Sequence, residues 1–323
     1  MIEHKLRNLV VSGYGSKVGK KGKLIYVETE ENKLKISPKE LEQLILFDEG
    51  KITCGAIRYL YREDVDVVFV DEKHNQFLRI VDGEENPLSD LWIEQMELGR
   101  KEKLRLISEI LRASFYNKSR LLSQFGLEVG DLKERILKLD ESESSDILRG
   151  KEGEFSKRYF SKIKKLIGSE FEFEKREKNP PPDPINSMLS YGYTVLKSRI
   201  QYSLLRAGLN PYIGILHESY RDRPALSFDM MEIFRSVIVD RTVLTMLNKG
   251  MIDLDDFEYP EEGICYITGD GKQSYLNELF KRMESKHEYD EDRLEFLDIM
   301  FLQAEELADH VKGKDEFKGF RWR

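Results

Sequence analysis

The first 86 positions alternate between short apolar runs and polar turns, which is the pattern of β-strands. Residues 23–28 (Lys-Leu-Ile-Tyr-Val-Glu), 65–70 (Val-Asp-Val-Val-Phe-Val) and 77–81 (Phe-Leu-Arg-Ile-Val) are rich in β-branched and aromatic side chains, which favour strands. Ser37, Pro38 and Glu40 predict a helix start, with Ser37 as N-cap and Glu40 closing a capping box. A second short helix is expected over residues 55–62. We therefore expect a small β-rich domain over residues 1–86.

A polar stretch at residues 82–87 predicts a linker, and beyond it the apolar spacing changes to that of helices. One stripe repeats every three or four residues and predicts a long helix with a buried face; it consists of Ile185, Leu189, Tyr193, Leu196, Ile200 and Leu204. Helices are also expected over residues 228–247 and 274–310, whereas the proline-containing stretch 168–184 predicts a loop. The expected fold class is α+β, with a larger all-helical domain over residues 87–323.

Composition narrows the class of protein. The chain has 323 residues, of which 40% are hydrophobic and only two are cysteines, Cys54 and Cys265. No apolar run approaches the roughly 18–20 residues that a membrane span needs, and no signal-peptide pattern opens the chain. Because the two cysteines form no CxxC pair, a reducing cytoplasm is the expected location.

The formal net charge of −8 argues against a general nucleic-acid coat, since phosphate binding needs a basic surface. A basic groove can nevertheless lie on an acidic molecule. The charge therefore makes a nucleic-acid partner less expected without excluding it.

His217 is the first candidate for metal chemistry. It follows an apolar stretch, and Asp229 and Glu232 come twelve and fifteen residues later. A neutral imidazole and carboxylates are ligands of divalent metals, and residues three apart share one face of a helix. A simpler interpretation also stands for each: His217 as a loop residue with one hydrogen bond, and the acids as favourable charges near a helix start capped by Ser227.

Glu152 is the second candidate. It lies between Gly150 and Gly153, and glycine beside a carboxylate permits close approach of backbone or ligand. The alternative is again an acid in the first turn of a helix.

Basic residues accompany both candidates. Divalent metal ligands flanked by Arg and Lys suit phosphodiester chemistry, because the metal and the cations neutralise the phosphates, although such runs are commonly solvated surface. The expected DNA-binding residues are Lys157, Arg158, Lys162, Lys164, Lys165, Arg221 and Arg223. Phosphate-binding loops, zinc-spaced Cys/His sets and the GxSxG and HExxH motifs are absent from the sequence.

Four ordered segments together resemble one family, the first CRISPR-associated protein family, which contains the integrases and endonucleases of spacer acquisition. They are residues 150–153 (Gly-Lys-Glu-Gly) with Tyr159-Phe160, 184–193 (Pro-Ile-Asn-Ser-Met-Leu-Ser-Tyr-Gly-Tyr), 208–217 ending in His217, and 226–235 containing Glu232. The N-terminal stretches 50–53 and 65–69 also fit, so the resemblance extends from about residue 1 to residue 310.

The resemblance implies that Glu152, His217 and Glu232 are catalytic residues that bind Mn²⁺ or Mg²⁺, with Asp229 as a secondary ligand. It implies dimerisation through domain 1–86 and a catalytic domain over 87–323. Double-stranded, branched DNA is the implied substrate. The implied assembly is two homodimers bridged by a small ferredoxin-like subunit, with no membrane partner.

The expected function is metal-dependent phosphoryl transfer that cleaves DNA and joins the 3′-OH ends of new spacer DNA to the repeat array. Two alternatives stay open. One is a non-catalytic DNA-binding scaffold, in which the acids only cap helices; the other is an unrelated metal-dependent phosphoesterase, which the net charge of −8 mildly favours.

Overall fold

The protein folds into two compact units, Met1–Asn86 and Pro87–Arg323. The computed structural model describes residues 2–5, 8–11, 15–29, 32–47, 50–71, 76–80, 89–137, 139, 144–178, 180–217 and 223–323. The expected linker at 82–87 lies outside the described residues.

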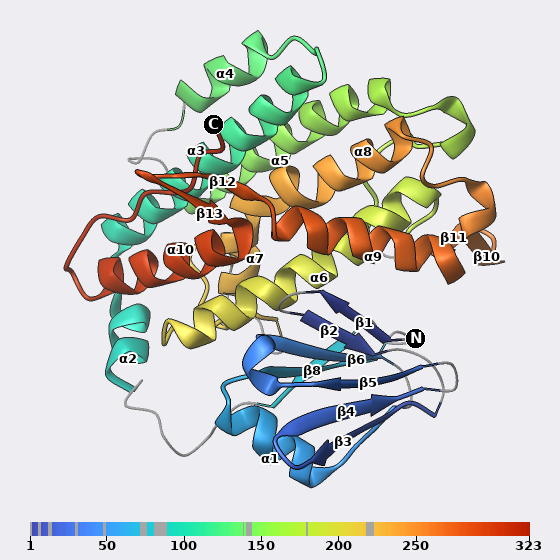
Figure 1. Ribbon diagram of the computed structural model, residues 1–323. Helices are drawn as coiled ribbons and strands as arrows, with labels where there is room; N and C mark the ends of the chain where they lie inside the picture. Colours follow the sequence, from blue (N-terminus) through green and yellow to red (C-terminus); the bar gives the residue numbers. More distant parts are fainter. Residues whose placement is uncertain are drawn as a thin grey trace. The chain divides into compact units, whose positions relative to one another are not determined.

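The N-terminal unit contains two β-sheets and one helix (Figure 1). The five-stranded sheet has the order β1 (Ile2–Lys5), β2 (Asn8–Val11), β6 (Gln43–Phe47), β8 (Asp66–Asp71) and β9 (Gln76–Arg79). The four-stranded sheet has the order β5 (Lys33–Ile36), β4 (Leu24–Glu28), β3 (Lys17–Lys21) and β7 (Lys51–Ile52). The β-rich character expected from the alternating pattern is confirmed.

The core of this unit lies between the sheets and helix α1 (Cys54–Arg62). Leu9 of β2, Leu44 of β6 and Ile25 of β4 are fully buried in it together with Leu60 of α1. Strands β2, β6 and β8 pair in parallel, so their near-continuous apolar runs are covered on both faces. The helix expected from Ser37 is only the 3₁₀ turn Pro38–Glu40, and the Ser37 side chain makes no capping hydrogen bond.

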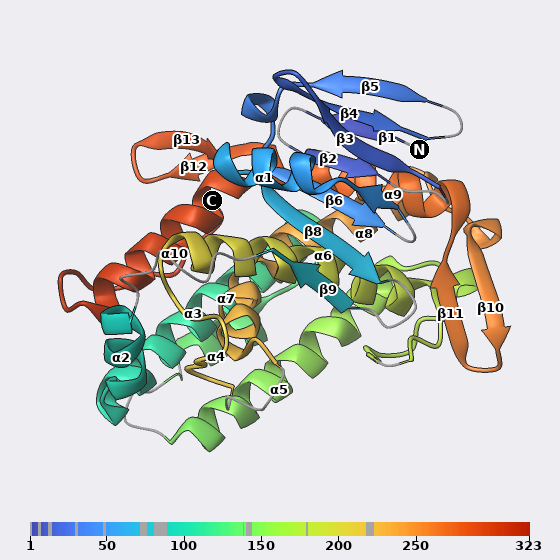
Figure 2. The same cartoon turned by 90° about the horizontal axis from the view of Figure 1, so that it is seen from below.

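The second unit is mostly helical (Figures 1 and 2). Its α-helices are α2 (Ser89–Glu97), α3 (Arg100–Gln124), α4 (Gly130–Leu137), α5 (Ser145–Ile163), α6 (Pro184–Arg206), α7 (Ala225–Arg235), α8 (Arg241–Asn248), α9 (Gly269–Met283) and α10 (Phe296–Val311). Asp183 caps α6 through Asn186 N, with Pro184 at its first position. The stripe from Ile185 to Leu204 lies largely on buried faces of α6, as expected for core.

The expectation of an all-helical second domain is wrong in detail, because the unit also contains two β-hairpins. One is formed by β10 (Phe257–Glu261) and β11 (Ile264–Ile267), the other by β12 (Lys286–Tyr289) and β13 (Asp292–Glu295). The second interrupts the helix expected over 274–310. Helix α9 begins at Gly269, in the region between the two hairpins.

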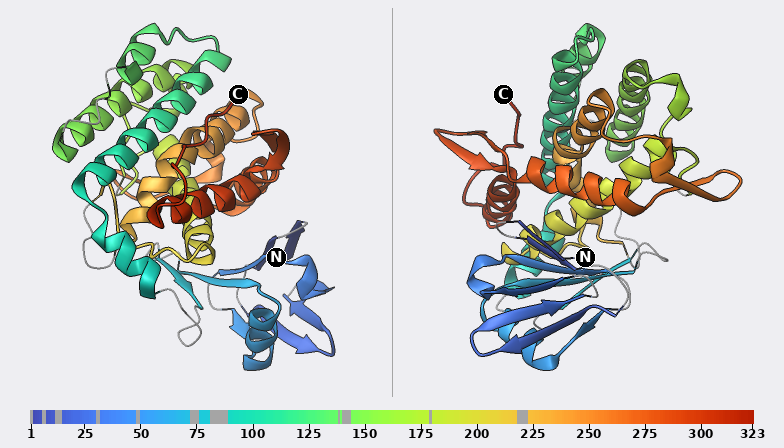
Figure 3. Two further views of the ribbon diagram at one scale, coloured as in Figure 1. Left: turned by 90° about the vertical axis from the view of Figure 1, so that its left-hand side faces the viewer. Right: turned by 45° about the vertical axis from the view of Figure 1, so that its right-hand side comes forward.

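Helix α7 packs against both α3 and α6 and continues through a π-helical turn, Ser236–Asp240, into α8 (Figure 3). A π-turn inside a helix commonly marks a functional site. Helix α5, which carries Glu152, also packs against α3, so α3 contacts both α5 and α7.

Candidate active site

Glu152 lies in the third turn of α5 and not at its start. The helix begins at Ser145, and the hydroxyl of its N-cap, Ser144, accepts a hydrogen bond from Ile147 N. The first-turn explanation of Glu152 is therefore wrong. Its spacing from the buried Leu148 and Phe155 places Glu152 on the inward face, where it is half-buried and accepts a 2.7 Å hydrogen bond from Ser156 Oγ.

The glycines beside Glu152 do not serve a close backbone contact in this structure. A Cβ atom added at Gly150 or Gly153 would meet nothing within 4 Å. Space is therefore open beside this turn of α5.

Asp229 and Glu232 lie well inside α7. The helix begins at Ala225, its N-cap is Pro224 without a capping hydrogen bond, and Ser227 is an interior residue. The interpretation of Ser227 as N-cap is therefore wrong. Both acids are almost completely buried, and burial of a carboxylate is costly unless charges or hydrogen bonds compensate it.

The compensation for Asp229 comes from the segment that ends at His217. Asp229 Oδ2 accepts hydrogen bonds from the backbone N–H groups of Ile215 (2.7 Å) and Leu216 (3.0 Å). Asp229 Oδ1 lies 3.1 Å from His217 N and 2.5 Å from His217 Nδ1. The hydrogen bond to Asp229 raises the pKa of His217 although burial opposes it. Asp229, expected as a secondary metal ligand, thus orients the imidazole of His217 in this structure.

Glu232 is compensated by two cations. Its Oε2 lies 3.1 Å from Lys118 Nζ, and its Oε1 lies 2.6 Å from Arg235 Nη1. Burial alone would raise the pKa of Glu232, but the charges of Arg235 and Lys118 outweigh it and lower that pKa to about 2. Glu232 is therefore an anion in the folded protein at neutral pH.

These groups share one electrostatic environment. The charge of Glu232 contributes to the raised pKa of His217. The pKa of Arg235 is raised, because the charges of Glu232 and Glu152 act against the effect of burial. Lys178, between the 3₁₀ turn Ser169–Phe171 and α6, has a pKa lowered by burial and by Arg235, while both glutamates oppose this. The charge of Arg235 thus acts on all three expected ligands, which lie on α5, α7 and the segment before α7.

Lys118 was not found from the sequence. It lies on the buried face of α3, at i+3 from Phe115 and i−4 from Leu122. A lysine in an apolar stripe at helical spacing is the signal that identifies it, because an unpaired buried lysine is costly.

Asp240 closes the π-turn beneath this site. Its carboxylate accepts hydrogen bonds from Tyr159 (2.6 Å) and Tyr193 (2.5 Å). Burial raises the pKa of Asp240 although the two hydroxyls oppose this. The contacts join α5 and α6 to the π-turn between α7 and α8.

The residue types at this site, one histidine and two glutamates, suit a divalent metal. The positions of their side chains do not yet form a metal site. A histidine whose Nδ1 is fixed by a carboxylate is the usual form of a metal-binding imidazole. In the described part of the chain, however, no three His, Cys, Asp or Glu side chains are already grouped as a metal site. Since both oxygens of Glu232 contact cations, metal binding there requires sharing or replacement of Lys118 or Arg235.

The expected DNA-binding residues differ in their surroundings. Lys157, Lys165 and Arg223 are exposed, whereas Arg221 lies outside the described residues. The others contact acidic or carbonyl groups: Arg158 with Glu154, Lys162 with Asp131 and the Glu128 carbonyl, and Lys164 with Glu174.

The chain is an α+β protein in which a β-rich unit is followed by a mostly helical unit. In the second unit the exposed imidazole of His217 contacts buried Asp229, and buried Glu232 pairs with Lys118 and Arg235. The family model described as "CRISPR associated protein Cas1" matches residues 9–281, and the chain belongs to this family. No helix in the described residues is long and apolar enough to cross a membrane.

Relatives and solved structures agree with this assignment. The chain is 31% identical to "CRISPR-associated endonuclease Cas1 1" of Methanospirillum hungatei, over 98% of this chain and all of the relative. It is 29% identical to a protein of the same name from Archaeoglobus fulgidus, over 97% and 98% of the two chains. A casposase bound to integration product has a TM-score of 0.86 at 25% identity, over 97% of this chain and 92% of the other. A CAS1 protein from Thermotoga maritima shares the fold, with a TM-score of 0.83 at 22% identity and coverage of 98% and 100%.

Proposed function

We propose that this protein is a metal-dependent DNA endonuclease and integrase of CRISPR spacer acquisition. It would join the 3′-OH ends of new spacer DNA to the repeat array by phosphoryl transfer. The observation that supports this most is the fixed pair His217–Asp229 beside buried Glu232, within a chain of the Cas1 family. Relatives named as endonucleases and a neighbour bound to integration product support the reaction class.

His217, Glu152 and Glu232 would hold the metal, Mn²⁺ or Mg²⁺. When bound, the metal would neutralise the scissile phosphate and lower the pKa of the attacking hydroxyl or water. One imidazole and two carboxylates favour Mn²⁺ somewhat, because Mg²⁺ prefers an all-oxygen shell.

Other side chains of the site would position the metal-binding groups and neutralise the charge of the phosphate. Asp229 holds His217 with Nδ1 turned to the carboxylate, so Nε2 is the nitrogen for a ligand. Arg235 and Lys178 supply positive charge in the environment of both glutamates, where charge that builds up on phosphate oxygens is stabilised.

DNA would also contact the four-stranded sheet of the N-terminal unit. Strand pairing places Lys17, Lys51 and Lys35 on one face with Tyr26, which pairs with Lys35. Lys21 and Lys33 share this face. It also carries one acid, Glu28, whose Oε1 lies 2.6 Å from Lys33 Nζ. A groove of about 610 Å³ runs beside Tyr26 and Lys35. Such lysines contact phosphates without reading sequence, which reconciles DNA binding with the net charge of −8.

The assembly would be a homodimer that dimerises through residues 1–86 and binds a small ferredoxin-like subunit. Solved neighbours described as Cas6-RT-Cas1–Cas2 complexes support a subunit of the Cas2 type. A neighbour described as a TtCas1–DNA complex supports DNA as partner.

The deciding experiment is nicking of branched duplex DNA by wild type, Glu152→Gln and His217→Asn, each with Mn²⁺ and with chelator. Of these three proteins, we expect only wild type to nick the DNA, and only with Mn²⁺. A matched control is Glu154→Gln, which changes an exposed acid one half-turn from Glu152. Metal-independent DNA binding without nicking would favour the scaffold, and hydrolysis of small phosphodiesters without DNA nicking would favour an unrelated phosphoesterase.

A further inference from the structure

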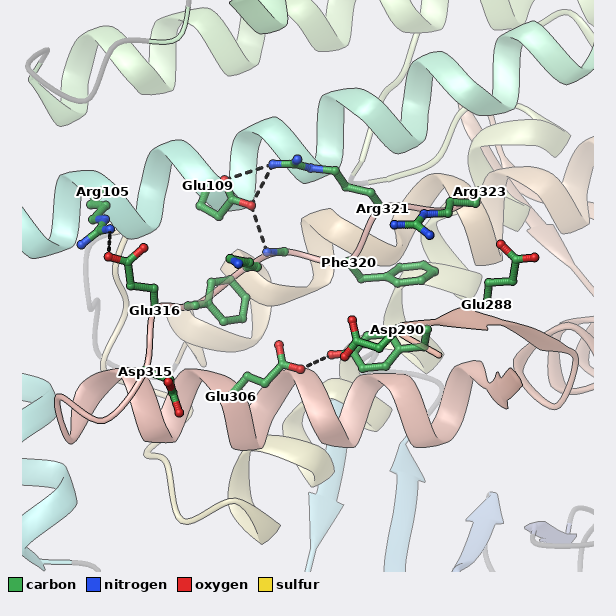
Figure 4. Close-up of a pocket in the computed structure, with 14 residues that line it drawn as sticks. Arg105, Glu109, Glu288, Asp290, Glu306, Asp315, Glu316, Phe320, Arg321 and Arg323 are labelled. Carbon is green, nitrogen blue, oxygen red and sulfur yellow. Dashed lines mark hydrogen bonds and ion pairs between the residues drawn. The ribbon is translucent and has the colours of Figure 1, made fainter. Parts of the chain in front are cut away.

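The segment Phe317–Trp322, called here the strap, has no regular secondary structure, and all of its residues except Lys318 and Arg321 are buried. Phe317, Phe320 and Trp322 are each at most 5% exposed, and the segment lies against α3 and α10 (Figure 4). It forms one wall of a cavity of about 910 Å³ that is also lined by Arg105, Glu109 and Glu306. A buried segment outside helices and sheets must satisfy its backbone polar groups through side chains.

Side chains of α3 and α10 satisfy the strap. Glu109 of α3 accepts a hydrogen bond from Gly319 N at 3.1 Å and also pairs with Arg321. Gln303 of α10 accepts from Phe320 N at 2.7 Å and donates to the Lys318 carbonyl at 3.0 Å. Two histidines also accept hydrogen bonds from the strap: His310 Nδ1 from Phe317 N (3.0 Å) and His287 Nδ1 from Trp322 Nε1 (3.1 Å).

Asn117 of α3 joins the strap to the catalytic helix. Its Oδ1 accepts a 2.8 Å hydrogen bond from Trp322 N, and its Nδ2 donates to the Phe320 carbonyl at 2.9 Å. The same Nδ2 donates to the Ile233 carbonyl of α7 at 2.9 Å. Asn117 is fully buried, so these three contacts use both donors and an acceptor of its amide.

The contacts fall on residues adjacent to the candidate site. Ile233 follows Glu232 in α7, and Asn117 precedes Lys118, the partner of Glu232, in α3. Packing supports the same junction, because Phe320 stacks on Phe234 with ring centroids 5.9 Å apart. A Cβ atom at Gly319 would lie 2.6 Å from Ala113 Cβ and 3.6 Å from Ile233 Cδ1, so only glycine permits this approach.

We propose that Asn117 is a positioning residue which, with the strap, fixes α7 against α3 and so sets Glu232 relative to Lys118. The role in catalysis rests on the proposed function, whereas the mechanical role does not. Loss of the Asn117 amide leaves buried acceptors and a donor unsatisfied in α7 and the strap. Movement of α7 then displaces Glu232 in the site without removing any group that touches DNA.

The test compares Asn117→Leu, a variant of similar shape without polar atoms, with Ile252→Ala, which removes a buried side chain after α8. Ile252→Ala controls for general destabilisation. A second pair is Gly319→Ala, which crowds Ala113, and Gly130→Ala, whose added Cβ meets nothing within 4 Å. Hydrogen–deuterium exchange of residues 225–240 and Trp322 fluorescence in a Trp92→Phe background report on α7 and the strap without any need for nuclease activity.

We expect Asn117→Leu and Gly319→Ala to increase exchange in residues 225–240 and to shift the Trp322 emission to longer wavelength. Ile252→Ala, compared at equal loss of Tm, and Gly130→Ala should leave both the exchange and the Trp322 emission unchanged. On DNA, kcat should fall about tenfold or more with KM within about twofold, as for loss of one interaction made in the transition state.

Unchanged exchange and Trp322 emission in both strap variants would overturn the proposal. So would a kcat loss in Asn117→Leu that Ile252→Ala reproduces at the same Tm. If all proteins lack nuclease activity while exchange of α7 rises only in the strap variants, the proposed function fails and the mechanical role of Asn117 stands. If Asn117→Leu does not fold, Gly319→Ala with its glycine control carries the test alone.

Discussion

Asp229 accepts a hydrogen bond from His217 Nδ1 at 2.5 Å while its other oxygen binds the backbone of residues 215 and 216. The same carboxylate therefore fixes both the fold of the segment before α7 and the orientation of the imidazole. With Nδ1 held by Asp229, Nε2 is the ring nitrogen of His217 that would bind a metal ion.

Asp229→Asn tests this relationship. Because the hydrogen bond to Asp229 raises the pKa of His217, the variant should lower that pKa, and Mn²⁺ affinity should fall about 10–100-fold. NMR titration of the His217 ring and calorimetric Mn²⁺ titration measure the two effects. The rings of His287 and His310 serve as internal controls, and an unchanged pKa of His217 would show that Asp229 does not act on it.

The same hydrogen bond makes a pH-dependent contribution to stability. A folded-state pKa above the ordinary value means that this contribution is fully present below the unfolded pKa and is lost as the pH rises through the folded one. The difference in Tm between wild type and Asp229→Asn should therefore shrink as the pH rises above the His217 pKa. A difference that is constant across this range would contradict the link.

Glu232 should make the opposite contribution. Its pKa falls from 4.5 to about 2 on folding, so its stabilising effect is present above about 4.5 and is lost as the pH falls toward 2. The difference corresponds to about 3 kcal/mol in the free energy of unfolding. Urea unfolding of Glu232→Gln between pH 7 and pH 2 should show lower stability at pH 7 and a flatter acid limb, whereas an acid limb equal to that of wild type would contradict this.

Lys118→Met removes one cation from buried Glu232 while it retains the apolar stem. Breaking a buried pair costs about 3–5 kcal/mol, so Tm should fall in metal-free buffer. Mn²⁺ should then raise the Tm of this variant more than that of wild type, since a bound metal replaces the lost charge. The exposed Lys157→Met is the control, and a Mn²⁺ effect equal to that of wild type would exclude Glu232 as a ligand.

The lysine face of the four-stranded sheet should contribute to DNA affinity through phosphates. In the variant Lys17→Ala/Lys35→Ala, affinity should fall similarly for all DNA sequences, and the slope of log K against log salt should become shallower by about 0.9 for each lost contact. Fluorescence anisotropy at several salt concentrations measures the slope. Lys39→Ala, an exposed lysine outside this face, is the control; equal slopes in all three proteins would remove the face from the DNA path.

Sequence patterns predicted the parts of the fold that depend on long periodic runs. The stripe on α6 and the apolar run of β8 were identified because burial imposes a spacing on them. The hairpin β12–β13 was missed because its two strands are short and rich in charged residues. Its turn also requires a positive φ of +50° at Asp290, which is not a glycine. Such hairpins are stabilised by tertiary packing that a local pattern does not contain.

The candidate site shows the same division. His217, Glu152 and the pair Asp229 and Glu232 could be singled out by residue type and spacing. Family resemblance then made Glu232, and not Asp229, the expected ligand on α7. The pairing of Lys118 with Glu232 joins positions 114 residues apart, so no local pattern predicts it. The helix-start explanation of Asp229 failed because α7 begins at Ala225, before Ser227; helix ends are set by packing as well as by capping residues.

The most direct measurement of the central claim is covalent strand transfer. Labelled duplex DNA with a free 3′-OH is incubated with repeat-containing DNA, Mn²⁺ and either wild type, Glu152→Gln or the Glu154→Gln control. The account predicts joined product with wild type and Glu154→Gln, and its loss with Glu152→Gln, with chelator or with a 3′-deoxy end. Joined product at the wild-type rate from Glu152→Gln, or from wild type in chelator, would contradict it.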